Sequence, residues 1–174
     1  MDMVNGFFGD LVAMVQEHHA WAAPVIFVLA FGESLALVSL LFPATVVLFG
    51  IGALIGAGGL EFWPLWAAAA IGAALGDSVS YWLGARYGQA IFRLWPLSRH
   101  PELLPRGMAF FGRWGAASVF LGRFFGPLRA SVPLVAGICA MPRLPFQLAN
   151  WTSALVWAAG ILAPGTIGLG LLQR

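Results

Sequence analysis

The chain has 174 residues, of which 60% are hydrophobic and only 9% are charged. Soluble domains carry roughly 25% charged residues, so this chain has too few polar side chains to cover a water-soluble core. The formal net charge is +2, every one of the nine basic residues is Arg, and a single cysteine excludes an intrachain disulfide. The composition therefore predicts an all-α integral membrane protein that forms a single membrane domain over residues 1–174.

The first expected elements are a surface helix and a broken hairpin. Residues 1–19 place most of their apolar side chains near one side of a helix, which predicts an amphipathic helix at the membrane surface. Residues 20–60 are apolar, carry only one charge, Glu33, and are interrupted at Pro43. Each half is shorter than the roughly 20 apolar residues of a straight span. A re-entrant hairpin, whose tip must be buried or line a wet cavity, is therefore expected.

Residues 62–85 predict a transmembrane helix with one charge, Asp77. Small residues recur at every fourth position along this helix and just beyond it, at Ala68, Gly72, Gly76, Ser80, Gly84 and Gly88. Such a ladder allows another helix to approach closely. These glycines therefore indicate helix packing and not phosphate binding.

The second half repeats this order. Residues 86–113 contain five arginines and three prolines, and the positive-inside rule predicts that they form a cytoplasmic loop, without any need for nucleic acid. Residues 115–142 predict a second re-entrant hairpin, and residues 145–173 a second transmembrane helix, with a polar packing contact at Asn150. One hairpin and one span make an odd number of crossings per half. The two halves are therefore expected to be inverted repeats, a known transporter architecture.

Three charged residues are the main candidates for a functional site: Glu33, Arg123 and Arg129. A charge at the bilayer centre costs at least about 2.5–3.5 kcal/mol, so it persists when it is paired or faces water. Arg123 and Arg129 flank a Gly-Pro break, and two permanently charged guanidinium groups there suit a phosphate. Glu33 is a candidate for proton exchange.

The structural alternatives stay open at this stage. Glu33 could snorkel to the surface, and the two arginines could serve only to neutralise Glu33 and Asp77 as ion pairs. For Asp77 a structural pair with an arginine is as good an interpretation as a function, and Arg86 is expected to end its span at the cytoplasmic face. No GxSxG, HExxH or P-loop pattern is present. We expect neither an enzyme nor a cofactor nor a metal.

Several segments together resemble the DedA family, the bacterial members of the VTT-domain proteins. They are Phe31-Gly32-Glu33-Ser34 with Pro43, the run from Gly76 to Arg86, and Gly122-Arg123-Phe124 followed by Arg129, Pro133 and Ala136-Gly137. The resemblance implies a multi-pass protein of the bacterial inner membrane with two opposed hairpins. It also implies a lipid translocase, a flippase or scramblase, that moves undecaprenyl phosphate or another phospholipid and depends on the proton gradient. The resemblance further implies that function needs an acidic residue in the first hairpin and two arginines in the second. In this chain Glu33, Arg123 and Arg129 occupy those positions.

One departure from the family concerns proton coupling. Many members carry a second acidic residue after the first-hairpin proline, where this chain has Pro43-Ala44-Thr45. Thr45 can hydrogen-bond but cannot carry a proton, so coupling through two carboxylates is not expected. A proton-coupled transporter of small ions or drugs is the alternative function, and a membrane protein whose charges only pair is a third. Membrane lipid and protons are the expected partners, together with further copies of the chain in a homo-oligomer.

Overall fold

The computed structural model describes residues 19–35, 48, 50–51, 60–92, 103–125 and 128–172. The main elements in these ranges are helices, in the order α2 (His19–Ser34), α4 (Phe62–Phe92), α5 (Leu103–Gly122), α6 (Leu128–Ile138) and α7 (Arg143–Leu172). The all-α expectation is confirmed for this part of the chain, which contains no strand. Within it, no helix is both long enough and apolar enough to cross a membrane. The expected surface helix of residues 1–19 lies outside the described residues except for His19, which begins α2, and the tip of the first hairpin also lies outside them.

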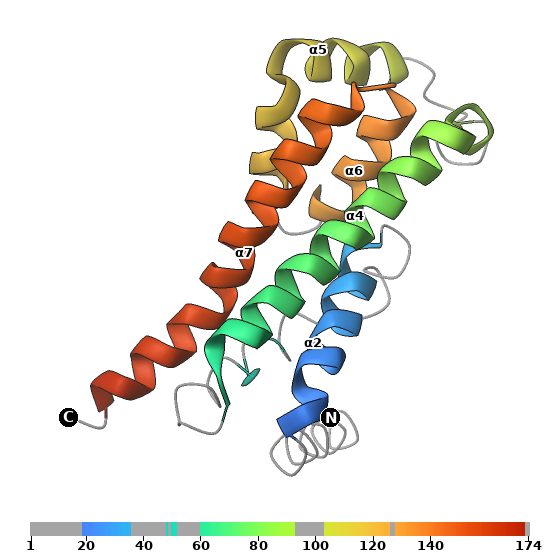
Figure 1. Cartoon of the computed structure of the whole chain (residues 1–174). Helices are drawn as coiled ribbons and strands as arrows, with labels where there is room; N and C mark the ends of the chain where they lie inside the picture. Colours follow the sequence, from blue (N-terminus) through green and yellow to red (C-terminus); the bar gives the residue numbers. More distant parts are fainter. Residues whose placement is uncertain are drawn as a thin grey trace, which may run out of the picture.

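Helix α4 is the centre of the fold, and α2 and α6 pack against it one after the other along its length (Figure 1). The glycines of α4 make this packing close. A Cβ on Gly72 would lie 2.5 Å from the carbonyl oxygen of Phe27, and one on Gly76 would lie 2.5 Å from that of Phe31. The backbone of α2 therefore lies directly on the first half of α4, as the small-residue ladder predicts.

The second half of α4 receives α6 in the same way. A Cβ on Gly84 would collide with the carbonyl oxygen of Leu134, and one on Gly137 of α6 would collide with the carbonyl oxygen of Tyr81. The two helices thus present glycines to each other's backbone. Because α2 and α6 share one ladder, the end of α2 and the start of α6 meet near the middle of α4. Ser80 marks this point, since its hydroxyl donates to the carbonyl oxygen of Ser34 over 3.2 Å.

The long helices α4 and α7 bury small side chains and expose large apolar ones. Their buried positions include Ala69, Ala73, Ala74, Ala154 and Ala158, which join Leu48 and Ile51 in one core. Their exposed positions include Ile71, Leu75, Val79 and Trp82 on α4, and Leu144, Leu148, Trp151 and Leu155 on α7. Large apolar side chains exposed along two neighbouring helices are typical of a face that contacts another protein or a membrane.

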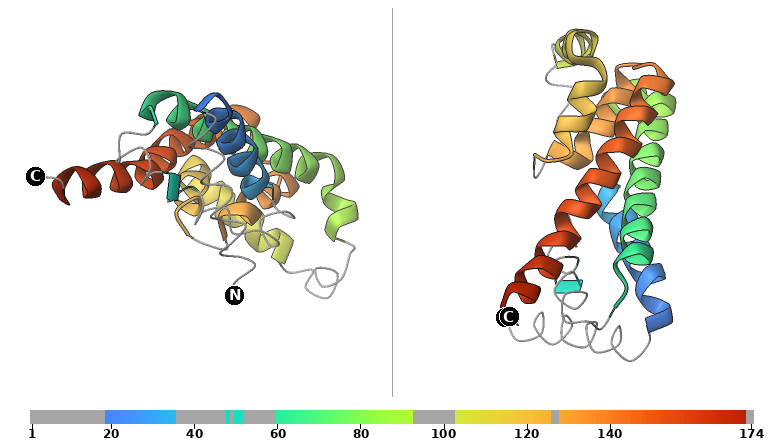
Figure 2. Two further views of the ribbon diagram at one scale, coloured as in Figure 1. Left: turned by 90° about the horizontal axis from the view of Figure 1, so that it is seen from below. Right: turned by 60° about the vertical axis from the view of Figure 1, so that its left-hand side comes forward.

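Residues 86–113 differ from the expected loop. Helix α4 continues past Arg86 to Phe92, so Arg86 does not end it, and α5 already begins at Leu103. Pro105 lies in the first turn of α5, where a helix tolerates proline because the missing N–H has no partner in the helix. At Gly115, with φ of 48°, α5 kinks. The segment before the kink lies across one end of the bundle, where α7 begins (Figures 1 and 2).

The turn between α6 and α7 has the hydrogen bonds of a Schellman motif. The N–H of Met141 donates to the carbonyl oxygen of Ala136, and that of Ala140 to Gly137, each over 3.0 Å. Ala140 has φ of 53°, the left-handed conformation that glycine usually provides at this position. Pro142 follows the motif and α7 starts at Arg143. This tight turn sends α7 back along α4.

Candidate functional site

Four charged side chains, three of them buried and that of Arg129 13% exposed, meet around the middle of α4. Glu33 comes from the end of α2, Asp77 from α4, Arg123 from the turn after α5, and Arg129 from the first turn of α6. Glu33 is 7% exposed, and Asp77 and Arg123 are each 5% exposed. Two carboxylates and two guanidinium groups give a formal sum of zero. The site thus consists of two ion pairs, of which one joins α2 to α6 and the other joins α4 to the turn after α5.

The pair of Arg123 and Asp77 belongs to a dense polar network. Nη2 of Arg123 donates to Oδ2 of Asp77 and, over 2.6 Å, to Oδ1 of Asn150. Nε of Arg123 donates to Oγ of Ser153 over 2.9 Å. The amide of Asn150 in turn donates to the carbonyl oxygen of Ala74 over 2.9 Å. A buried charge keeps its ionised form at tolerable cost when it is paired and hydrogen-bonded in this manner. Arg123 is therefore fixed between α4 and α7.

The pair of Arg129 and Glu33 is more sparsely supported. Nη1 of Arg129 lies 3.1 Å from Oε1 of Glu33, and the side chains are 13% and 7% exposed. The guanidinium carbon lies 4.6 Å from the ring centroid of Trp157 on α7, which is a cation–π contact. Nη2 of Arg129 is buried and has no hydrogen-bond partner among the described residues. Arg129 thus retains donor capacity that Arg123 has largely used.

The two pairs are not independent, because Arg129 is close enough to act electrostatically on both Asp77 and Arg123. A change of charge at one pair therefore alters the other. All four side chains are nearly enclosed by the protein. In the structure Glu33 pairs with Arg129, and Asp77 pairs with Arg123.

The remaining predicted residues take other positions. Pro43 and Thr45 lie outside the described residues. Pro133 is buried within α6. Arg86 is exposed near the end of α4 and its guanidinium carbon lies 5.6 Å from the ring of Tyr87. Arg86 therefore does not belong to the cluster.

Sequence reasoning did not single out Ser153 and Trp157, and it gave Asn150 only a packing role. All three lie on α7, on the face that carries the buried alanines. Asn150 and Trp157 are seven residues apart, or about two helical turns, a spacing that places them on the same side of a helix. That spacing is the signal that could have identified them. In the described part of the chain, no group of His, Cys, Asp and Glu could hold a metal ion.

Comparison with known proteins adds a family to this geometry. The family model described as the VTT domain matches residues 42–167. The inner membrane protein YabI of Escherichia coli K12 is 36% identical over 153 residues, which cover 88% of this chain and 60% of that protein. An uncharacterized membrane protein of Synechocystis is 41% identical over 123 residues, covering 66% of this chain and 53% of that protein. An uncharacterized membrane protein of Mycobacterium tuberculosis H37Rv is 40% identical over 100 residues, covering 55% and 46% respectively.

These relatives are longer than this chain, which spans between about half and three fifths of their length. No solved structure matches the chain.

Proposed function

This chain belongs to the VTT-domain, or DedA, family of membrane proteins, and on that premise we propose that it translocates a lipid phosphate across the bacterial inner membrane. The substrate would be undecaprenyl phosphate or another phospholipid. The observation that carries the proposal is the buried Arg129, which holds one carboxylate through Nη1 and keeps Nη2 without a partner among the described residues. A phosphate oxygen is a natural acceptor for such a group because guanidinium binds phosphate with two parallel hydrogen bonds.

The two arginines would have different roles. Arg123 is held by Asp77, Asn150 and Ser153, so it stays in place and supplies a fixed positive charge. Arg129 has fewer contacts within the protein and can exchange Glu33 for the phosphate. The ring of Trp157 keeps its guanidinium group oriented during that exchange.

A balance of charge connects this exchange to protons. The closed cluster holds two positive and two negative groups, which sum to zero. When a singly charged phosphate enters and Glu33 takes up one proton, Asp77 and the phosphate again balance the two arginines. Because a net charge at membrane depth costs several kcal/mol, the neutral combination is the favourable one. One carboxylate suffices for this coupling, so Thr45 need not carry a proton.

The topology that suits this function has the two hairpins entering from opposite faces of the bilayer. The ends of α2 and α6 would then meet near the midplane, beside α4 and α7. The lipid tail would stay against the exposed apolar residues of these helices, such as Leu75, Val79 and Leu155. Only the headgroup would enter the cluster, so that the tail never leaves an apolar environment.

The test is binding of undecaprenyl phosphate to the purified protein in detergent. Arg129→Gln removes the charge but keeps a side chain with hydrogen-bonding groups. We expect its affinity to fall by about tenfold or more, because hydrogen bonds to charged groups contribute about 1.5–3 kcal/mol. The exposed Arg113→Gln, on α5, is the matched control and should bind like the wild type. Equal binding by folded Arg129→Gln would contradict the proposal and favour transport of small ions or drugs.

A reversed ion pair separates binding from simple pairing. The double variant Glu33→Arg with Arg129→Glu exchanges the two charges between positions whose side chains are 3.1 Å apart in the wild type. If the charges only pair, this variant should behave like the wild type. If instead the guanidinium group must reach the phosphate from α6, beside Trp157, the variant should fold but should not bind undecaprenyl phosphate.

A further inference from the structure

A cavity lies away from the ion pairs, at the end of the bundle that α5 crosses. It has a volume of about 900 Å³ and lies between the last turns of α4, the end of α6 and the start of α7. Its lining includes Tyr81, Arg86, Tyr87, Met141 and Arg143, but none of the four charged side chains of the first site. The close glycine packing of α4 on α6 forms its floor, through Gly84, Gly88 and Gly137. This cavity therefore needs its own explanation.

The cavity carries positive charge only. Arg86 and Arg143 both line it, and its lining contains no Asp or Glu. Both arginines are exposed, and neither forms an ion pair with another described residue. Apolar residues such as Ala85, Ala90 and Ile138 make up much of the rest of the wall. The chemistry that fits is an anionic group attached to an apolar body.

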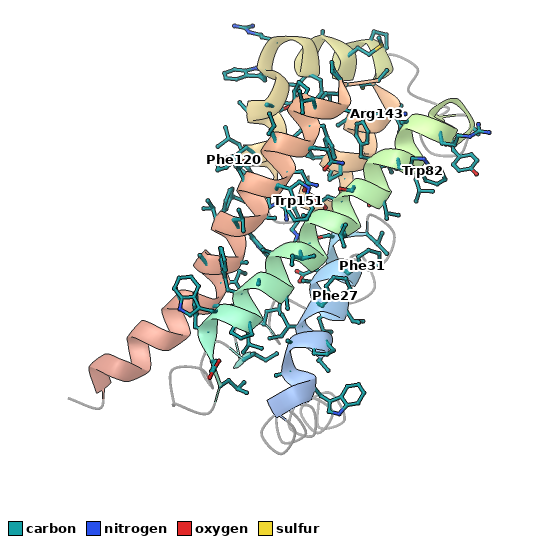
Figure 3. The ribbon with its side chains drawn as sticks, in the orientation of Figure 1. Phe27, Phe31, Trp82, Phe120, Arg143 and Trp151 are labelled. Carbon is teal, nitrogen blue, oxygen red and sulfur yellow. The ribbon has the colours of Figure 1, made fainter. Side chains whose placement is uncertain are left out.

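The surroundings of this cavity combine exposed aromatic residues with arginines. The first segment of α5 lies across the same end of the bundle, and it exposes Met108, Phe110 and Trp114 together with Arg106 and Arg113. A helix with exposed aromatic residues and arginines is typical of the membrane–water interface. Trp82 and Tyr87, 54% and 48% exposed, lie close by on α4, as aromatic belt residues do. Figure 3 shows Arg143 at this end of the molecule and Trp82 on α4.

We propose that this cavity binds the headgroup of an anionic glycerophospholipid from the cytoplasmic leaflet. Its phosphate lies between the guanidinium groups of Arg86 and Arg143, and its acyl chains follow the exposed apolar residues Val79 and Leu148 of α4 and α7. The arginines of this end of the chain favour the cytoplasmic side, where anionic lipids give the surface a negative potential. Such a lipid connects the end of α4 to the turn between α6 and α7. The inference requires a membrane protein but does not require lipid translocation.

The test is titration of the purified protein in neutral detergent with short-chain phosphatidylglycerol, with phosphatidylcholine as the comparison lipid. The variant Arg86→Gln with Arg143→Gln should lose phosphatidylglycerol affinity by about tenfold or more. The matched control, Arg106→Gln with Arg113→Gln, removes the same charge from the same end of the molecule but leaves the cavity lining intact. It should change the affinity by less than about threefold. Equal losses in both pairs would overturn the proposal, because they would indicate a general charge effect.

Two further measurements keep the proposal testable if the arginine variants do not fold. Ala90→Leu narrows the cavity while keeping both arginines, and it should also weaken binding; unchanged affinity would contradict the placement. Inorganic phosphate at millimolar concentration should not displace the lipid, and displacement would instead indicate a site for the free anion. Arg129→Gln should retain the part of the phosphatidylglycerol binding that Arg86→Gln with Arg143→Gln removes, so failure of the proposed translocation and failure of this site give different results.

Discussion

At the scale of single residues, the two arginines of the second hairpin have different environments although they look equivalent in sequence. Arg123 donates to three side chains from two helices, whereas Arg129 contacts one carboxylate and one aromatic ring. The first arrangement favours rigidity and the second allows exchange of a partner. Under the proposed function, loss of either arginine should impair transport, but for different physical reasons.

This difference predicts unequal effects on stability. Arg123→Ala leaves Asp77 buried without its charge partner and leaves Asn150 and Ser153 without their donor. Removing one partner of a buried ion pair costs about 3–5 kcal/mol, so the thermal unfolding midpoint in detergent should fall strongly. Arg113→Ala, at an exposed position, is the control and should leave it nearly unchanged. A normal midpoint for Arg123→Ala would show that the network does not stabilise the fold.

At the scale of the elements, one face of α4 determines where α2 and α6 lie. Gly72 and Gly76 contact the backbone of α2, and Gly84 contacts that of α6. The ladder therefore controls how close Glu33 and Arg129 come to each other. Its glycines contribute to the site although none of them touches it.

Glycine substitutions should separate packing from helix propensity. Gly84→Ala places a methyl group against the carbonyl oxygen of Leu134, a backbone atom that cannot turn away. Overpacking of this kind costs about 1–3 kcal/mol, so Gly84→Ala should lower the thermal midpoint. Gly160→Ala on α7 has nothing within 4 Å of the added Cβ and should raise it, because alanine favours a helix by about 1 kcal/mol. The same sign for both variants would contradict the packing argument.

The turn between α6 and α7 predicts a stabilising change. Ala140 adopts φ of 53°, which costs a residue with a side chain about 1–2 kcal/mol relative to the right-handed region. Ala140→Gly removes this strain, and part of the gain is offset by the greater freedom of glycine in the unfolded chain. We expect a net gain of up to about 1 kcal/mol, seen as a higher thermal midpoint. A lower midpoint would show that the methyl group of Ala140 contributes packing that exceeds its strain.

At the scale of the whole molecule, the end that α5 crosses carries Arg86, Arg106, Arg113 and Arg143, whereas Glu61 is exposed at the opposite end, just before α4. This charge distribution predicts that the α5 end faces the cytoplasm. It also predicts that α4 runs with its start toward the outside, as required for two inverted halves.

Cysteine labelling checks this orientation. In a Cys139→Ala background, Arg106→Cys should react with a membrane-impermeant thiol reagent in inside-out vesicles but not in intact spheroplasts. Glu61→Cys should show the opposite pattern, since it lies at the other end of α4. Labelling of both positions from the same side would contradict this orientation.

Much of the fold could be predicted from the sequence because its signals are local. The small-residue ladder, the break at the Gly-Pro dipeptide and the charged positions in apolar surroundings are each visible in a short stretch of chain. The helical part of 86–113 was missed because frequent arginines and prolines resemble a loop. Arginine is nevertheless a good helix former, and Pro105 occupies a turn that tolerates it.

The sequence by itself determined that the chain is helical and apolar and that Glu33, Asp77, Arg123 and Arg129 are its exceptional residues. Only the tertiary structure decided which carboxylate each arginine faces, since that depends on where α2 and α6 dock along α4. It also brought Asn150, Ser153 and Trp157 to the site and formed the cavity between Arg86 and Arg143. These contacts join residues tens of positions apart. Their geometry depends on where each helix docks against the others, and no single stretch of the chain specifies that.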